Sequence, residues 1–218
     1  MKGLIIISAG HLGREVYSWA RQSSDHGLAW TVKGFLDDRA DILRAFRYDV
    51  PVLGPPGGWR PSDDELFICA IGDPAERRRY VEPLAARGAR FARVVHPSAT
   101  IGENVHFGEG VVVCPQAVVS CDTRLGDHVL VNCHATVGHD VEIGPFSVLN
   151  PHANLGGGVR LGPLVSVGSS AVLLPRAVAE EGAVIGAGSV VLKRVGAGET
   201  VFGVPAKPVA LPRAAPGA

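Results

Sequence analysis

The C-terminal half of the chain repeats with a period of six residues, and this period constrains the fold more than any other feature. Eighteen anchor positions, six residues apart, run from Val95 to Ala197. Sixteen of them carry a bulky apolar side chain, and the exceptions are Ala179 and Ala197. The position after an anchor is often glycine, and the residue four positions after it is small or β-branched. The bulky anchors are Val95, Ile101, Phe107, Val113, Val119, Leu125, Val131, Val137, Ile143, Leu149, Leu155, Leu161, Val167, Leu173, Ile185 and Val191.

A six-residue period predicts a triangular coil with short, flat sides. Each anchor points inward, the residue four positions later fits the narrow corner, and we expect glycine to relieve the turn. Three hexads make one coil, so the eighteen hexads predict about six coils. A β-sandwich would instead alternate with period two and turn every eight to twelve residues. The sequence therefore favours a parallel β-helix over residues 93–218.

The first part of the chain predicts a small parallel α/β domain over residues 1–92. Apolar runs at 4–7, 31–36 and 66–71 are typical of buried strands, and a helix is expected over 14–22. Strand, helix and strand in this order predict parallel strands, whose carboxyl ends are where ligands gather. Those ends carry His11, Asp37, Asp38 and Gly72.

A glycine-containing loop follows the first predicted strand. Residues 8–13 read Ser-Ala-Gly-His-Leu-Gly, which lacks the full G-x-G-x-x-G spacing. Two interpretations stay open: a tight turn that only leads into the helix, or backbone amides that hold a phosphate at the helix start. Asp37 lies about 25 residues past the loop, near the place of an acid that reads a nucleoside. Nothing nearby supports hydride transfer, so we do not expect NAD.

Composition excludes several classes of partner. The chain has 21 basic and 21 acidic residues, so no charge excess points to nucleic acid or to an anionic membrane. The four cysteines show no C-x-x-C spacing, and we expect free thiols in a cytoplasmic protein. The apolar run at 4–7 is too short for a signal peptide, and no stretch approaches membrane-spanning length.

Short motifs from both halves occur in the order found in one family. With the hexad repeat they resemble the hexapeptide-repeat (left-handed β-helix) sugar acetyltransferases. That family includes bacterial N-acetyltransferases for nucleotide-linked 4-amino sugars, of the bacillosamine and perosamine type, and sialic acid O-acetyltransferase-like proteins. The resemblance covers nearly the whole chain. The motifs are Gly10-His11, Gly34-Phe35-Leu36-Asp37-Asp38, Ala70-Ile71-Gly72-Asp73, Gly138-His139-Asp140 and Gly203-Val204-Pro205-Ala206-Lys207.

The resemblance implies a Rossmann-like α/β domain followed by a left-handed parallel β-helix, assembled as a homotrimer with active sites between neighbouring helices. It implies acetyl-CoA as co-substrate, no metal, and N-acetylation of a UDP- or GDP-linked 4-amino-4,6-dideoxy sugar. The family's coenzyme contacts fall on Gly157, Ser169 and Ala187. Val148 stands where bacillosamine-type enzymes place a second histidine against acetyl-CoA. The family's nucleotide-sugar contacts fall on Ala9, Gly10, His11, Asp37, Asp38, Gly72 and Asn132.

His139 matches the family's catalytic histidine. A histidine titrates near neutral pH and can take the proton of the attacking amine or hydroxyl, which contributes about 10²–10⁴-fold in rate. Asp140 stands at the position of the family's orienting carboxylate, which is often glutamate, and it is one methylene shorter. Such a carboxylate fixes the imidazole tautomer. The alternative is a turn histidine beside a solvated aspartate.

Three other functions stay open at this point. A sialic acid type O-acetyltransferase needs the same base and coenzyme groove, so N- and O-acetylation both fit the sequence, as do uridine and guanosine. A γ-class carbonic anhydrase binds zinc through three histidines, and His134 and His139 have the spacing of two of them, but residues 97–100 supply no third. The β-helix could also be a non-catalytic trimerising stalk for a sugar-nucleotide-binding domain.

Overall fold

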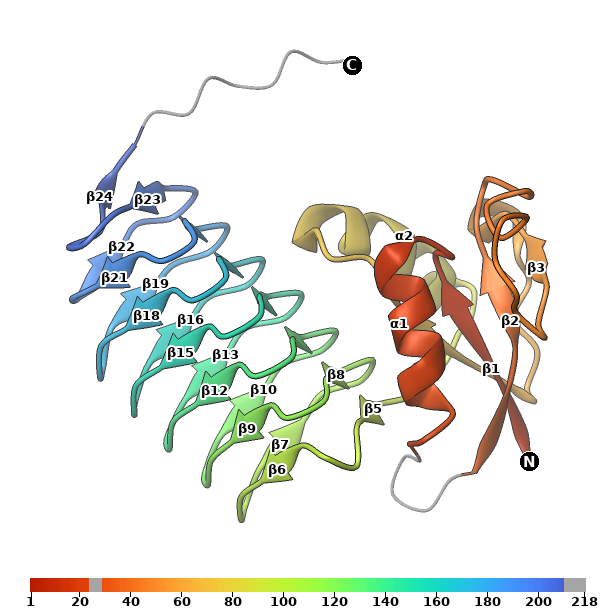
Figure 1. The fold of residues 1–218 in the computed structure, drawn as a ribbon, viewed down its shortest axis with the longest axis horizontal. Helices are drawn as coiled ribbons and strands as arrows, with labels where there is room; N and C mark the ends of the chain where they lie inside the picture. Colours follow the sequence, from red (N-terminus) through yellow and green to blue (C-terminus); the bar gives the residue numbers. More distant parts are fainter. Residues whose placement is uncertain (24–28, 210–218) are drawn as a thin grey trace.

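The computed structural model describes residues 1–23 and 29–209, and in it a small α/β domain leads into a column of stacked coils (Figure 1). The α/β domain contains a four-stranded parallel sheet in the order β3-β2-β1-β4. The strand that the sequence predicted over residues 66–71 is β4, and the short edge strand β3 was not predicted. The strands are β1 (Lys2–Ile7), β2 (Trp30–Leu36), β3 (Val52–Gly54) and β4 (Glu65–Cys69).

Helices cover both faces of this sheet. Alternate residues of β1 point to opposite sides: Leu4 and Ile6 pack toward α1 (His11–Ala20), and Ile5 and Ile7 pack toward α2 (Pro74–Ala86). A strand buried on both faces reads as a continuous apolar run, as 4–7 does. Helix α1 begins at residue 11, three residues earlier than predicted, and α2 was not predicted. A 3₁₀ turn, η1 (Pro56–Gly58), follows β3. Within the described residues no helix is long and apolar enough to cross a bilayer.

Three parallel sheets form the sides of the β-helix, and we call them the first, second and third face in chain order. The first face contains β5 (Val94–Val95), β8 (Val112–Val113), β11 (Leu130–Val131), β14 (Val148–Leu149), β17 (Ser166–Val167), β20 (Val184–Ile185) and β23 (Thr200–Phe202), with β24 (Lys207–Pro208) antiparallel at its end. The second face contains β6 (Thr100–Ile101), β9 (Val118–Val119), β12 (Thr136–Val137), β15 (Asn154–Leu155), β18 (Val172–Leu173) and β21 (Val190–Val191). The third face contains β7 (His106–Phe107), β10 (Arg124–Leu125), β13 (Glu142–Ile143), β16 (Arg160–Leu161), β19 (Val178–Ala179) and β22 (Arg194–Val195).

The anchors fill the centre of this column, as the sequence predicts. Almost every one packs in a single apolar cluster, together with the residue four positions later. The prediction for Ala197 is wrong: Ala197 is exposed, and Val195 is the buried anchor that follows Val191. The cause is a hexad shortened by two residues, which brings β22 sixteen residues after β19 instead of eighteen. Six coils result, and the last has a short side.

The corners turn differently from the expectation. We name each corner after the face that it follows. For the anchors from Ile101 to Ile185, the residue three positions later takes the left-handed conformation, with φ between 57° and 64° where it is not glycine. The glycines directly after the anchors have no such φ, and they are needed for a different reason. A Cβ on Gly138 would lie 2.8 Å from the backbone nitrogen of Gly157, and one on Gly168 2.5 Å from that of Ala187. These glycines allow consecutive coils to approach, and they do not relieve the turn.

The α/β domain covers the lower part of the first face. The outward side chains of Val94, Val112, Leu130 and Val148 belong to the same apolar cluster as the buried residues of α1. On the other side of the junction, Arg77 of α2 donates to the backbone oxygen of Phe146 at 2.6 Å, at the third corner. The two domains therefore share buried contacts through α1 and through α2.

Candidate active site

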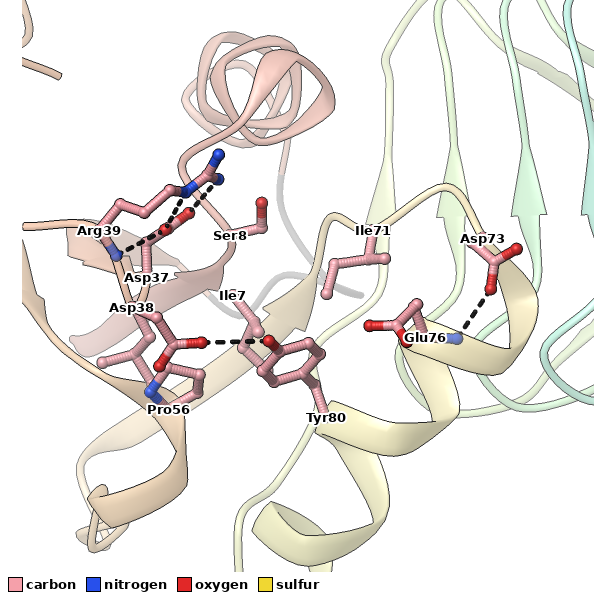
Figure 2. Close-up of a pocket in the computed structure, with 11 residues that line it drawn as sticks. Ile7, Ser8, Asp37, Asp38, Arg39, Pro56, Ile71, Asp73, Glu76 and Tyr80 are labelled. Atoms are coloured by element: carbon pink, nitrogen blue, oxygen red, sulfur yellow. Dashed lines mark hydrogen bonds and ion pairs between the residues drawn. The ribbon is translucent and has the colours of Figure 1, made fainter. Parts of the chain in front are cut away.

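A cavity of about 420 Å³ opens at the carboxyl ends of the strands in the α/β domain (Figure 2). Its position agrees with the sequence-based expectation for a parallel sheet. Of the predicted residues, Asp37 and Asp38 line it directly, Ala9 and Gly72 adjoin lining residues in the chain, and the Gly10 amide donates to the side chain of the lining residue Ser8. The lining residues are Ile7, Ser8, Leu36, Asp37, Asp38, Arg39, Pro56, Ile71, Asp73, Glu76 and Tyr80.

The loop after β1 is held close to the helix that it starts. Ser8 has φ 78°, and its hydroxyl accepts a hydrogen bond from the Gly10 amide at 3.2 Å. A Cβ on Gly13 would lie 2.0 Å from the Ser8 carbonyl oxygen, so only glycine permits this approach. His11 is exposed at the first residue of α1 and does not line the cavity. The glycines of this loop therefore serve the strand-to-helix turn.

Asp37 holds this loop against the end of β2. Its carboxylate accepts from the Ala9 amide at 2.9 Å, from the Arg39 amide at 3.0 Å and from the Arg39 guanidinium at 2.9 and 3.1 Å. Burial acts to raise the pKa of Asp37, but the hydrogen bonds from Arg39 and Ala9 outweigh it and leave the pKa below its usual value. Both oxygens thus have protein partners, which gives Asp37 a structural task beside any contact with a ligand.

Residues at the start and along α2 form the opposite wall of the cavity, and Tyr80 reaches from there to Asp38. The Tyr80 hydroxyl donates to Asp38 at 3.1 Å, and Asp73 caps α2 by accepting from the Glu76 amide at 2.8 Å (Figure 2). Burial, followed by the bond to Asp38, raises the pKa of Tyr80. Sequence reasoning missed Arg39, Glu76 and Tyr80. The Asp73-Pro74 pair, a capping residue before a proline at the first helical position, is the signal that could have revealed α2.

His139 and Asp140 lie at the second corner, and Asp140 reaches the ring. Nδ1 of His139 is 2.6 Å from Oδ2 of Asp140, and the two side chains are 65% and 68% exposed. The shorter aspartate can do this because the residue after the histidine takes the left-handed conformation, with φ 57°. When the Asp140 carboxylate accepts a hydrogen bond from Nδ1–H, Nε2 is left as the basic nitrogen. Such a pair can remove a proton from an incoming nucleophile.

The environment of His139 was only partly predictable. A Cβ on Gly157, one coil further on, would lie 2.6 Å from Nε2 of His139, so the ring lies over Gly157 and a larger residue would displace it. Asp122, one coil earlier, was missed. Hydrogen bonds from Asn104 and Cys121 lower its pKa, and the charge of His139 adds to this effect.

The remaining predicted residues lie at or near the first corner. Ser169 and Ala187 are exposed there in consecutive coils, joined by a backbone hydrogen bond of 2.8 Å from Gly188 to Ser169. Asn132 is half-buried just before this corner, and its side chain accepts from the Cys133 amide at 2.7 Å. In one chain, therefore, Ser169 and Ala187 flank the opposite edge of the second face from His139.

The histidines do not assemble a metal site. His134 stacks on His152 at the first corner, with ring centroids 4.8 Å apart, while His139 lies at the second corner. Across residues 1–23 and 29–209, no three His, Cys, Asp or Glu side chains gather in a way that could hold a metal ion. Within one chain, therefore, His134 and His139 do not converge on a common point with a third ligand of the kind that a catalytic zinc needs.

Fold and site together define a hexapeptide-repeat β-helix protein with an N-terminal α/β domain. A model of the PglD N-terminal domain matches residues 3–84. The acetyltransferase domain of PglB from Neisseria gonorrhoeae FA1090, solved in complex with acetyl coenzyme A, is 32% identical; the match covers 95% of this chain and 99% of that one, with a TM-score of 0.86. The chain belongs to the PglD-type family of hexapeptide-repeat acetyltransferases.

Two further relatives carry information on chemistry. PerB from Caulobacter crescentus, in complex with CoA and GDP-perosamine, is 28% identical over 96% of this chain and 98% of that one, with a TM-score of 0.85. That perosamine N-acetyltransferase has also been solved with a histidine replaced by asparagine or by alanine. UDP-N-acetylbacillosamine N-acetyltransferase of Bacillus subtilis (strain 168) is 29% identical over 115 residues. That match spans 52% of this chain and about half, 51%, of the curated relative.

Proposed function

We propose that the protein transfers the acetyl group of acetyl-CoA to the amino group of a nucleotide-linked 4-amino-4,6-dideoxy sugar. The observation that carries the proposal is the exposed His139–Asp140 pair, with 2.6 Å between Nδ1 and Oδ2, on a β-helix whose relatives bind CoA and an amino-sugar nucleotide. The substrate's nucleotide is UDP or GDP, the two types found among those relatives.

His139 acts as the general base in a direct transfer. The amine attacks the thioester carbonyl, and Nε2 of His139 takes the proton that the nitrogen loses. The C–S bond breaks, the acetyl group stays on nitrogen as an amide, and the proton passes to the departing CoA thiolate. Asp140 holds the ring tautomer and stabilises the imidazolium that forms. The His139 ring is exposed, which suits a base that must reach a substrate from outside its own chain.

The cavity of the α/β domain is the site for the nucleotide. Its position at the strand ends favours a nucleotide-type ligand, and α1 begins three residues after the lining residue Ser8, so that a helix start of the kind that binds phosphate lies next to the cavity. The Arg39 guanidinium, 66% exposed and anchored by Asp37, adds a positive charge at this edge. Arg39 is therefore a stronger candidate for contacting the diphosphate than Asp37, whose oxygens already have partners.

The active form is a homotrimer that closes around the second face. The outward residues of the third face include Arg124, Glu142, Arg160 and Arg194, whereas those of the second face are all uncharged. Uncharged surfaces favour subunit contact. If the second faces of three copies turn toward a common axis, the second corner of each copy meets the first corner of the next. His139 then faces the neighbour's first corner at its own level, Ser169 and Ala187 lie two and three coils further along that corner, and acetyl-CoA lies in the groove between the two corners. The outward residues of the second face are Thr100, Val118, Thr136, Asn154, Val172 and Val190.

An amine is a better candidate than a hydroxyl for the acceptor. Both the curated relative and the solved perosamine enzyme are named as N-acetyltransferases. The alternative, a sialic acid type O-acetyltransferase, would use the same base but would leave the nucleotide-type cavity without a ligand. The panel below includes free sialic acid for this reason.

The test is a thiol-release assay with acetyl-CoA and a panel of UDP- and GDP-linked 4-amino-4,6-dideoxy sugars, with free sialic acid alongside. We expect turnover on a nucleotide amino sugar and loss of that turnover in His139→Ala, with His106→Ala, at an exposed position on the third face, as the matched control. Turnover on sialic acid alone would replace the proposal by O-acetylation. Binding of a nucleotide sugar without thiol release from any member would favour a non-catalytic stalk.

A further inference from the structure

Two arginines share a hollow beside the catalytic corner. The hollow has a volume of about 400 Å³ and lies on the side of the second corner that turns toward the third face. Its lining residues are Asp140, Gly158, Arg160, Arg176 and Val178. Asp140 is the only acidic group among them, and it is already engaged with His139. The rest of the hollow therefore presents two positive charges.

The backbone positions of Arg160 and Arg176 leave both side chains accessible to a ligand in solvent. Arg176 takes the left-handed corner conformation with φ 64°, and a Cβ on Gly158 would come within 3.3 Å of its Cγ. Glycine at 158 thus leaves room for the Arg176 stem. Arg160 stands on the third face between Glu142 and Val178 in the strand ladder. Both side chains are exposed, and within the part of the chain that the structure describes neither takes part in an ion pair.

These charges lie beyond His139 along the axis of the column. Gly158 follows the residue that supports the His139 ring, and Arg176 stands at the same corner position one coil later. Neighbouring parallel strands are about 4.8 Å apart, so the two arginines stand about 5–10 Å along the axis from the base. A donor with its thioester at His139 and its arm running up this corner would bring its distal groups to the hollow.

We propose that Arg160 and Arg176 bind phosphate groups of CoA, the diphosphate or the 3′-phosphate, and so hold the acyl donor along the second corner. The inference rests on the proposed function and extends it to residues that neither the motifs nor the family resemblance singled out. Guanidinium groups bind phosphate oxygens in bidentate fashion, and charge-assisted hydrogen bonds are about twice as strong as neutral ones. The nucleotide sugar also carries a diphosphate, so the experiment must separate these two sources.

The test compares acetyl donors with and without phosphate. Kinetics with acetyl-CoA and with S-acetylpantetheine are measured for wild type, Arg160→Gln, Arg176→Gln and the double variant, with Arg124→Gln on the same face as control. We expect the double variant to raise the KM for acetyl-CoA by about 10-fold or more. The KM for S-acetylpantetheine and the KM for the nucleotide sugar should stay unchanged. The 3′-phosphate is separated from the diphosphate by acetyl-dephospho-CoA.

Three results would overturn the inference: an unchanged KM for acetyl-CoA, an equal rise for both donors, or a rise confined to the nucleotide sugar. Calorimetric binding of CoA and of pantetheine gives a readout that needs no turnover. If wild type releases no thiol from any donor but prefers CoA over pantetheine, and the double variant loses that preference, the phosphate site stands while the proposed function fails. Absence of CoA binding to wild type would overturn both.

Discussion

Two corners of neighbouring coils, built by the same six-residue repeat, have opposite characters. At the second corner the His139 side chain is 65% exposed, and it contacts Asp140 and lies over Gly157 of the next coil. At the third corner His128 is buried, stacked on Phe146 at 5.0 Å and edge-on to Phe91 at 4.7 Å between ring centroids. Burial, with a smaller effect from the Arg77 charge, lowers the pKa of His128 to about 4.

The difference lies in what covers each corner and not in the repeat. The α/β domain packs over the third corner through α2, whose Arg77 donates to the carbonyl oxygens of Phe146 and Ser147 at 2.6 and 3.3 Å. The second corner has no such cover within the described chain. A β-helix thus provides equivalent backbone positions, and the appended domain decides which of them remain available for chemistry.

Exchanging each ring for phenylalanine tests this contrast most strongly. We expect His139→Phe to lower kcat by about 10²–10⁴-fold, because the base is lost, and to change the free energy of unfolding by less than about 0.5 kcal/mol. His128→Phe should keep full activity, since Phe146 already occupies the equivalent corner position with φ 61°. Thiol release measures kcat and urea unfolding measures the free energy of unfolding, with all variants at the same protein concentration. Equal losses of activity in the two variants would show that the corners are not functionally distinct.

Removing the Arg77 side chain, which joins α2 to the third corner, should lower the stability of the protein. Arg77 is buried, and it also donates to the carbonyl oxygens of Ile71 at 2.6 Å and Gly72 at 3.4 Å. Arg77→Met leaves these carbonyls without donors, so we expect a loss of about 2–4 kcal/mol in the free energy of unfolding. Arg78→Met, on the exposed side of α2, serves as the control. A loss no larger than that of the control would mean that Arg77 does not tie the domains together.

The buried histidine should make stability depend on pH, with the smallest effect of the three. The pKa of His128 is about 4 in the folded state and 6.5 without the fold. Between these values the unfolded chain binds the extra proton, so stability is complete above pH 6.5 and falls as pH drops toward 4. The loss is at most about 3 kcal/mol.

Unfolding curves for wild type and His128→Phe at several pH values isolate this contribution from the carboxylates that titrate in the same range. The difference between the two proteins should grow in favour of the variant as pH falls through that window. His134→Phe, at an exposed corner, should follow wild type. A constant difference would show that His128 is as easily protonated in the fold as outside it.

The repeating parts of the fold could be predicted from the sequence, because every coil requires an apolar side chain at each anchor position. The prediction of a buried anchor was wrong at Ala197 only because the shortened hexad moved the buried position to Val195. The corner glycines were assigned the wrong cause, since their contacts are with the next coil, sixteen to nineteen residues away in sequence. A pattern within one hexad gives no information on how closely the backbone of the next coil approaches.

The candidate site was predictable to a lesser degree. His139 and Asp140 stand out by motif, but their contact depends on the left-handed φ of residue 140. The position of Asp37 at the end of a predicted strand indicated a role in the site. Its hydrogen bonds to Ala9 and Arg39 could not be predicted, because they depend on how the loop after β1 packs against the end of β2. Tyr80 and Glu76 enter the cavity from a helix that the sequence pattern did not reveal. Contacts between distant segments account for most of what was missed.

The shortened hexad between Val191 and Val195 also indicates where the chain tolerates changes in length. It occurs in the last coil, where only β23 and the terminal strand follow it. The same deletion between His139 and Gly157 would change the spacing between these two residues, and the His139 ring would no longer lie over Gly157. Natural insertions and deletions in relatives of this chain should therefore gather at the C-terminal end of the column or come in whole coils of eighteen.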